Sequence, residues 1–222
     1  MTTIRNLLNI IDESPYLIPG VGDRELLRRS MSLTALNRDY NKITETEFLD
    51  IYIDKSKTHI VGIDKKTELP EKGRVVQIFR IKINSKFKFS FPNNFQNLIQ
   101  VENVAIIKSL SGLGFATDVY EALRDVGYTL VSDEVHRDSG KGLWQKISRL
   151  NKVYIVSVNR GIFVDQQGIP ILYDGTNNFE NIIWTSDEDH SSLDIVLVLS
   201  PVGFNPKITD DNVVRLSEEE LI

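Results

Sequence analysis

An apolar run that meets a Gly-x-Gly turn constrains the fold of this chain more than any other feature. Residues 104–107 read Val-Ala-Ile-Ile, and the turn contains Gly112 and Gly114. Residues 115–126 carry apolar side chains at steps of three and four, which predicts one apolar face of a helix. Glycines let the backbone approach a ligand, and the free N–H groups of a first helical turn can hold an anion. The stretch therefore predicts a strand, a turn and a helix, arranged either to bind an anion or only to pack.

Two common nucleotide-binding turns are excluded by the residues themselves. The turn is not a Walker loop, because no Gly-Lys-Ser/Thr follows it. It is not a complete dinucleotide fingerprint, because Thr117 occupies the position of the third glycine.

The segments after the turn extend the pattern. Residues 129–135 predict a short buried strand. Asp138-Ser139-Gly140 offers a helix cap, and an apolar stripe follows at helical spacing, at Leu143, Trp144, Ile147 and Leu150. Residues 152–159 are rich in Val, Ile and Tyr, which is typical of a strand. The predicted order is strand, Gly-x-Gly turn, helix, strand, helix, strand.

In this order of elements the chain resembles the GNAT superfamily, the acyl-CoA-dependent N-acyltransferases. The family signature at the turn is Arg/Gln-x-x-Gly-x-Gly/Ala, which residues 111–116 match at Gly114 and Ala116, with Ser111 at the Arg/Gln position. Residues 130–133, together with 142–144, are similar to a bacteriophage-type subgroup. The resemblance covers about residues 45–160, roughly half of the chain.

The resemblance implies a fold and a cofactor. The implied fold is α+β, with a GNAT-like mixed, mostly antiparallel sheet and a central parallel, splayed strand pair flanked by helices. The implied co-substrate is acetyl-CoA, whose pyrophosphate would sit on the glycine turn, and the acceptor is an amine of unknown identity. The cofactor-binding residues would be Val104, Ile106, Ser111, Gly112, Leu113, Gly114, Phe115, Ala116 and Trp144.

The resemblance also implies catalytic residues. Glu102 aligns with the carboxylate that many of these enzymes use as a base, and its alternative is a solvated glutamate near a strand end. Trp144 falls where many members have a tyrosine that protonates the thiolate, and its alternative is a core tryptophan. Tyr154 is the proposed replacement acid, with Tyr128 as a second candidate, although either could be a packing residue.

The end of the strand at residues 129–135 carries two further candidates. Parallel sheets place ligands at the carboxyl ends of their strands, where Asp133 and His136 are expected. Asp133 could equally be a helix cap, and His136 a surface residue.

The remaining segments set the predicted domain organisation. Residues 1–40 are expected to form an N-terminal helical segment, with Met31 in its second helix, and 41–200 the GNAT-like domain. Strands are predicted at 48–53 and 58–63 as a hairpin, and at 75–83, 98–110 and 195–199. A hairpin at 161–173 belongs to an insertion at about 161–190, and 201–222 is expected to be an acidic surface tail. Only the central strand pair is expected to be parallel, and residues 104–107 are expected to be covered on both faces.

Composition bounds the function. The absence of cysteine excludes thiolate zinc sites, disulfides and a cysteine nucleophile. No apolar run approaches the ~20 residues of a membrane span, and no signal-peptide pattern is present, so a cytoplasmic protein without a membrane partner is expected. The net charge of −5 argues against bulk nucleic-acid binding, although not against a small local patch. Residues 86–89, Lys-Phe-Lys-Phe, are read as alternating strand residues rather than as a nucleic-acid platform. A homo-oligomer is left open.

Two functions from different classes follow. The first is an acyl-CoA-dependent N-acetyltransferase. The second is a catalytically inactive GNAT-like scaffold, which would serve as a phage structural or host-interaction protein.

Overall fold

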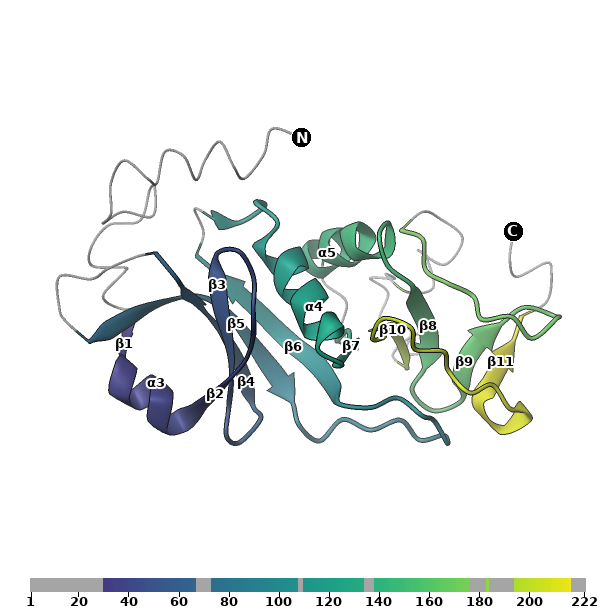
Figure 1. Ribbon diagram of the computed structural model, residues 1–222. Coiled ribbons are helices and arrows are strands. Elements are labelled where there is room, and N and C mark those ends of the chain that lie inside the picture. The colour runs from purple at the N-terminus through teal and green to yellow at the C-terminus, as the bar shows by residue number, and fades with distance from the viewer. Residues whose placement is uncertain are drawn as a thin grey trace. The chain divides into compact units, whose positions relative to one another are not determined.

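The computed structural model describes residues 30–66, 73–107, 110–133, 138–175, 183 and 194–216 (Figure 1). Within them the chain is an α+β protein with a mixed, mostly antiparallel sheet. The strands are β1 (Ser30–Ser32), β2 (Tyr40–Glu45), β3 (Leu49–Asp54), β4 (His59–Asp64), β5 (Arg74–Asn84), β6 (Leu98–Ile106), β7 (Thr129–Val131), β8 (Val153–Ser157), β9 (Gly161–Val164), β10 (Ile195–Leu199) and β11 (Val213–Arg215). The helices are α3 (Leu33–Asp39), α4 (Phe115–Asp125), α5 (Asp138–Ser148) and the 3-10 helix η3 (Asp210–Asn212). None of the described helices is long and apolar enough to cross a membrane.

The chain divides into two compact units. The first unit contains the described residues up to Ile83, together with Asn103–Ala122. The second unit contains Asn84–Glu102 and the described residues from Leu123 onward. The chain passes from one unit to the other at the last residue of β5, inside β6 and again inside α4.

The first unit is built on an antiparallel run of strands. β2, β3, β4 and β5 pair in sequence order, and β1 pairs with β5. The strands predicted at 48–53 and 58–63 are β3 and β4, and their hairpin is confirmed. In β3 the side chains of Leu49, Ile51 and Ile53 are buried and alternate with partly exposed ones, as a strand with one covered face requires. Of the helical segment predicted at 1–40, only residues 30–40 are described: Met31, which was expected in a helix, lies in β1, whereas Leu33–Asp39 form the helix α3.

The turn between β3 and β4 is closed by the side chain of Asp54. Its carboxylate accepts hydrogen bonds from the backbone N–H groups of Thr58 (2.7 Å) and His59 (2.8 Å), and from the hydroxyl groups of Ser56 and Thr58. Burial raises the pKa of Asp54, but these hydrogen bonds together lower it by more. The pKa of Asp54 therefore lies below its ordinary value. The carboxylate therefore stabilises the hairpin in its ionised form.

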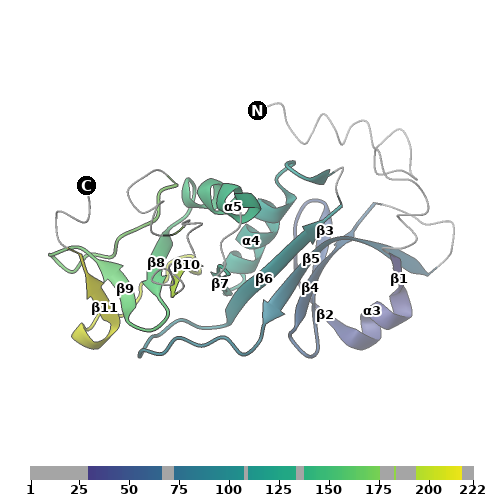
Figure 2. The same ribbon diagram turned by 180° about the vertical axis from the view of Figure 1, so that it is seen from behind.

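The second unit contains the predicted parallel pair. The first residues of β6 pair with β7 in parallel, which confirms that prediction. β10 lies antiparallel between β7 and β8, and β8 pairs antiparallel with β9. β11 pairs with β9 in parallel, and Figures 1 and 2 both show the two strands side by side. The expectation of a single parallel pair was therefore wrong, and so was that of a mere surface tail at 213–215, because these residues complete a sheet edge.

A close approach of two backbones fixes β9 against η3. Gly161 has φ +133°, and a Cβ atom at this position would lie 2.2 Å from the backbone carbon and oxygen of Asn212. The buried Asn212 side chain accepts from the Thr209 N–H (2.8 Å) and donates to the carbonyl groups of Lys207 (2.6 Å) and Pro92 (3.2 Å). Only a glycine allows both the positive φ and this contact.

Two predicted element ends differ from the structure. The strand predicted at 98–110 ends at Ile106, because the chain leaves the sheet to enter the turn. The helix predicted to include Leu150 ends at Ser148, and the Leu150 side chain is 76% exposed instead of joining the apolar stripe.

Candidate functional site

The glycine turn lies in the first unit and connects β6 to α4. The Leu110 N–H donates to the Ile107 carbonyl (2.9 Å), and the Asp118 N–H donates to the Gly114 carbonyl (3.0 Å) as the helix begins. Gly112 has φ +82° and Gly114 has φ +97°, a region in which residues with a Cβ atom are strained. A Cβ atom at Gly112 would meet nothing within 4 Å. Glycine is therefore required here by the backbone conformation, and the space beside the exposed Gly112 is open.

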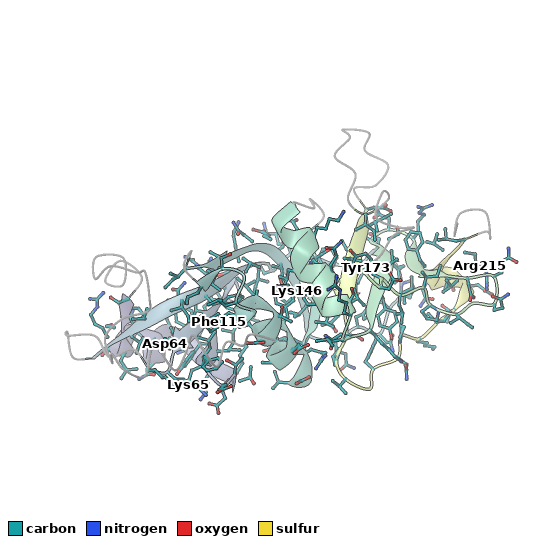
Figure 3. The ribbon with its side chains drawn as sticks, turned by 90° about the horizontal axis from the view of Figure 1, so that it is seen from above. Asp64, Lys65, Phe115, Lys146, Tyr173 and Arg215 are labelled. Carbon is teal, nitrogen blue, oxygen red and sulfur yellow. The ribbon has the colours of Figure 1, made fainter. Side chains whose placement is uncertain are left out.

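The start of α4 presents unpaired donors. The backbone N–H groups of Phe115, Ala116 and Thr117 precede the first helical hydrogen bond and have no acceptor among the described residues. The helix is anchored by its apolar face, since Phe115, Val119 and Leu123 are at most 5% exposed. Phe115 lies among the packed side chains of the first unit (Figure 3). Its ring is edge-on to that of Phe48, with the two ring centroids 6.0 Å apart. These donors are thus held rigidly at the positive end of an 11-residue helix.

Carboxylates surround the same helical turn. Burial raises the pKa of Asp118, and the negative charges of Glu121 and Glu47 raise it further. Glu47 belongs to the connection between β2 and β3, next to Phe48. Lys65 is bound to that connection through the Thr46 carbonyl (2.8 Å) and lies 3.3 Å from a Glu45 oxygen. An anion at the start of α4 would therefore meet both favourable donors and unfavourable carboxylates.

The parallel strand pair of the second unit is short. β6 and β7 share three residue pairs, which end at Gln100 and Val131. Beyond Val131 the Ser132 N–H donates to the Leu197 carbonyl (2.9 Å), and the Ser132 hydroxyl accepts from the Leu197 N–H (2.9 Å). The chain after β7 thus stays with β10, whereas β6 continues to Ile106 and has β5 as its other neighbour in the sheet.

The second half of β6 corrects an expectation. Residues 104–107 were expected to be covered on both faces, but Val104 and Ile106 are half-exposed and Ala105 is exposed. Only Ile107 is buried, at 1% exposure. Among the described residues β7 pairs only with the first residues of β6, Leu98 to Gln100, and a continuous apolar run does not by itself show which of its residues will be covered. Apolar side chains are therefore accessible here.

The remaining predicted residues belong to the second unit. Glu102 is half-buried near the end of that unit's part of β6. Trp144 on α5 is 4% exposed, and Tyr154 on β8 is 3% exposed. Burial raises the pKa of Tyr154, and a hydrogen bond with Ser200 lowers it in part. Tyr154 also packs in the apolar core with Phe89, Phe91 and Val156, so its ring has a structural role whatever else it does.

Three candidates remain, namely Tyr128, Asp133 and His136. Tyr128 and Asp133 are half-buried, and the Asp133 carbonyl accepts from the Ser132 hydroxyl (3.2 Å). His136 lies outside the described residues. The structure thus groups the predicted residues at 104–116 in the first unit and places Glu102, Trp144 and Tyr154 in the second.

Sequence reasoning missed the carboxylates of the turn. Asp118 stands three residues into α4, so its position could have been noticed in the sequence. Glu47 could not, because only the packing of Phe48 on Phe115 brings its connection to the helix. Comparison of the whole chain with family models, curated proteins and solved structures gave no significant match.

Proposed function

We propose that this chain binds an acyl-CoA at the glycine turn and transfers its acyl group to an amine. One observation carries the proposal: a parallel strand pair loses its pairing after three residue pairs, and the longer strand runs through a glycine turn into a helix with free N–H groups. This arrangement is the one that the resemblance to the GNAT superfamily implies.

The first unit provides the chemistry for the cofactor. Pyrophosphate oxygens would accept hydrogen bonds from the N–H groups of Phe115, Ala116 and Thr117, and the open space at Gly112 allows the approach. The amides of the pantetheine arm would pair with backbone groups of β6 near Val104 and Ile106, whose side chains are half-exposed. Ser111, next to Gly112 in the turn, is exposed and would add a hydroxyl in place of the family's longer side chain.

The transfer itself needs a base and an acid. The amine nitrogen attacks the thioester carbonyl carbon, its proton passes to the carboxylate of Glu102, and the carbon–sulfur bond then breaks. The departing thiolate takes a proton, for which the Tyr154 phenol is the candidate that the resemblance implies, since a phenol with the ordinary pKa of about 10 is protonated at neutral pH. The rest of the catalysis is positioning of the amine beside the thioester.

A non-catalytic scaffold is the second candidate, and one observation favours it. Asp118, Glu121 and Glu47 place negative charge around the turn where the pyrophosphate would bind. In a scaffold that binds no anion, these carboxylates would not weaken any function. Under this alternative the turn only packs α4 against the sheet.

Calorimetry with acetyl-CoA separates the two candidates. We expect binding by the parent chain and its loss in Gly112→Asp, because the new carboxylate would face the phosphates. Gly203→Asp is the matched control, since Gly203 has a similar φ of +77° and open space around it. Thermal unfolding of both variants checks that they fold. A parent chain that gives no heat with acetyl-CoA or CoA refutes the binding site and leaves the scaffold.

Catalysis is tested by release of free CoA. Because the chain has no cysteine, a thiol reagent detects only the CoA thiol. With a panel of amines as acceptors, we expect Glu102→Gln to slow release by ~10²–10⁴-fold while acetyl-CoA binding is retained. An equal rate for variant and parent would exclude Glu102 as the base.

A further inference from the structure

The connection between β5 and β6 carries positive charge and no carboxylate. Residues 85–97 include Lys86 and Lys88 but neither aspartate nor glutamate, in a chain whose net charge is −5. Figure 1 shows this connection as a long extended trace without helix or strand. The charge of this segment is therefore opposite in sign to that of the whole chain.

Alternation along the connection turns the aromatic rings inward and the lysines outward. Phe89 and Phe91 are 9% and 6% exposed, and the ring of Phe89 lies 5.1 Å from those of both Phe87 and Phe91. Lys86 and Lys88, which alternate with Phe87 and Phe89 along the chain, are exposed. The phenylalanines anchor the segment in the core of the second unit, so the lysines are held in place along its outer side.

Neighbouring segments of the same unit add two cations. The Ser90 N–H donates to the Val158 carbonyl (2.9 Å), so the turn before β9 lies next to the connection. This turn carries the exposed Arg160. The Lys207 N–H donates to the Asn94 side-chain oxygen (2.9 Å), and the Lys207 side chain is exposed. We call the four side chains Lys86, Lys88, Arg160 and Lys207 the basic edge.

The charges of the basic edge are unpaired. None of the four side-chain groups has an ion-pair or hydrogen-bond partner among the described residues. The Ser157 hydroxyl accepts from the Arg160 N–H (3.1 Å) and donates to the Asp194 carboxylate (2.6 Å), so this carboxylate is engaged by the hydroxyl. By contrast, Lys42 and Lys65 of the first unit are ion-paired with Glu45 and Asp50. Unpaired like charges on one edge repel one another and attract a polyanion.

We propose that the basic edge binds the phosphate backbone of a nucleic acid. Lys86 and Lys88 are separated by one residue and both exposed, so the two flexible side chains can reach neighbouring phosphates of one strand. A protein partner would require outward apolar or aromatic anchors, and here Phe89 and Phe91 are buried inward. Contacts to phosphates by Lys and Arg need no such anchor and carry no sequence specificity. The inference is independent of the acyltransferase proposal.

Fluorescence anisotropy with labelled oligonucleotides, single-stranded and duplex, tests the proposal on the full chain. For a single strand, four phosphate contacts give a slope of about −3 in log affinity against log salt, so binding weakens about 50-fold between about 50 and 200 mM salt. The double variant Lys86→Gln/Lys88→Gln should halve this slope, to about a sevenfold loss over the same range. Lys55→Gln/Lys57→Gln is the matched control: it removes an exposed Lys-x-Lys pair from the β3–β4 turn and should leave the slope unchanged.

The outcomes decide the matter in either direction. Binding of a single strand or a duplex that only the Lys86/Lys88 variant weakens supports the proposal. No binding at about 50 mM salt, or an equal loss in the two double variants, overturns it. Competition by poly-glutamate as effective as that by the oligonucleotide also overturns it, in favour of an acidic protein partner.

Discussion

The contact between Gly161 and Asn212 gives the sharpest test of the second unit. Replacing Gly161 with alanine places a Cβ atom 2.2 Å from two backbone atoms of Asn212 and 2.7 Å from the Val213 nitrogen. Backbone cannot rotate away as a side chain can, so η3 and the start of β11 must move. The substitution should therefore detach β11 from β9, which it joins in parallel.

Three contributions set the size of the effect. The positive φ of Gly161 costs an alanine about 1–3 kcal/mol. Displacement of Asn212 weakens three hydrogen bonds of its side chain, each with a net worth of about 0.5–1.5 kcal/mol. Leu216, which is 8% exposed, loses cover as well. Because these contributions overlap, we expect a total loss of at least about 3 kcal/mol.

Gly203→Ala is the matched control in the same unit. Gly203 has φ +77° and nothing within 4 Å of its absent Cβ, so alanine there should cost only the conformational strain of about 1–2 kcal/mol. Urea unfolding gives both free energies, and amide hydrogen exchange shows where each loss occurs. Equal losses in the two variants, with unchanged exchange in β11, would refute the steric argument.

Three further predictions concern single side chains. Trp144→Ala should lower the free energy of unfolding by ~3–5 kcal/mol in urea, because the ring is only 4% exposed; a loss below ~1 kcal/mol would contradict a core role. Asp54→Ala should cost about 1–2 kcal/mol at pH 7. Because the folded pKa of Asp54 is lowered, its stabilisation is fully present above the unfolded pKa of ~3.9 and is lost as the pH falls through the folded pKa. In acid unfolding, the stabilities of parent and variant should therefore converge below about pH 3.9. Glu47→Gln should tighten acetyl-CoA binding about two- to fivefold in calorimetry at low salt by removing a charge near the start of α4, and unchanged affinity would place the anion elsewhere.

Apolar patterns in the sequence predicted the strands that bury one face or both. β3, β4, β5, β8 and β10 were all expected close to their observed bounds, because alternating or continuous apolar residues mark them. β1, β2 and β11 were missed, β1 because its residues were expected in a helix. β2 is a polar edge strand without clear alternation, and β11 has only three residues, which become a strand because β9 offers them a ladder. Pairing supplied by a distant segment is not visible in a local pattern.

The candidate site was predictable in its backbone and not in its surroundings. Glycines before an amphipathic helix gave the turn at Gly112 and Gly114 correctly, because no other residue type tolerates their φ angles easily. The exposure of Val104 and Ile106 was not predictable, because a continuous apolar run does not show which of its residues other elements will cover. The charges around the turn likewise depend on which connection packs there.

The parallel pairing of β9 with β11 has a consequence for the order in which the chain is made. β9 leaves the ribosome well before β11, with β10 and η3 still to be synthesised between them. Until then one side of β9 has an open ladder of N–H and C=O groups, and long-range parallel pairing forms slowly. A nascent chain therefore carries an unpaired strand edge while residues 165–212 are synthesised. Translational pauses in the codons between Val164 and Val213 should make aggregation during expression more severe.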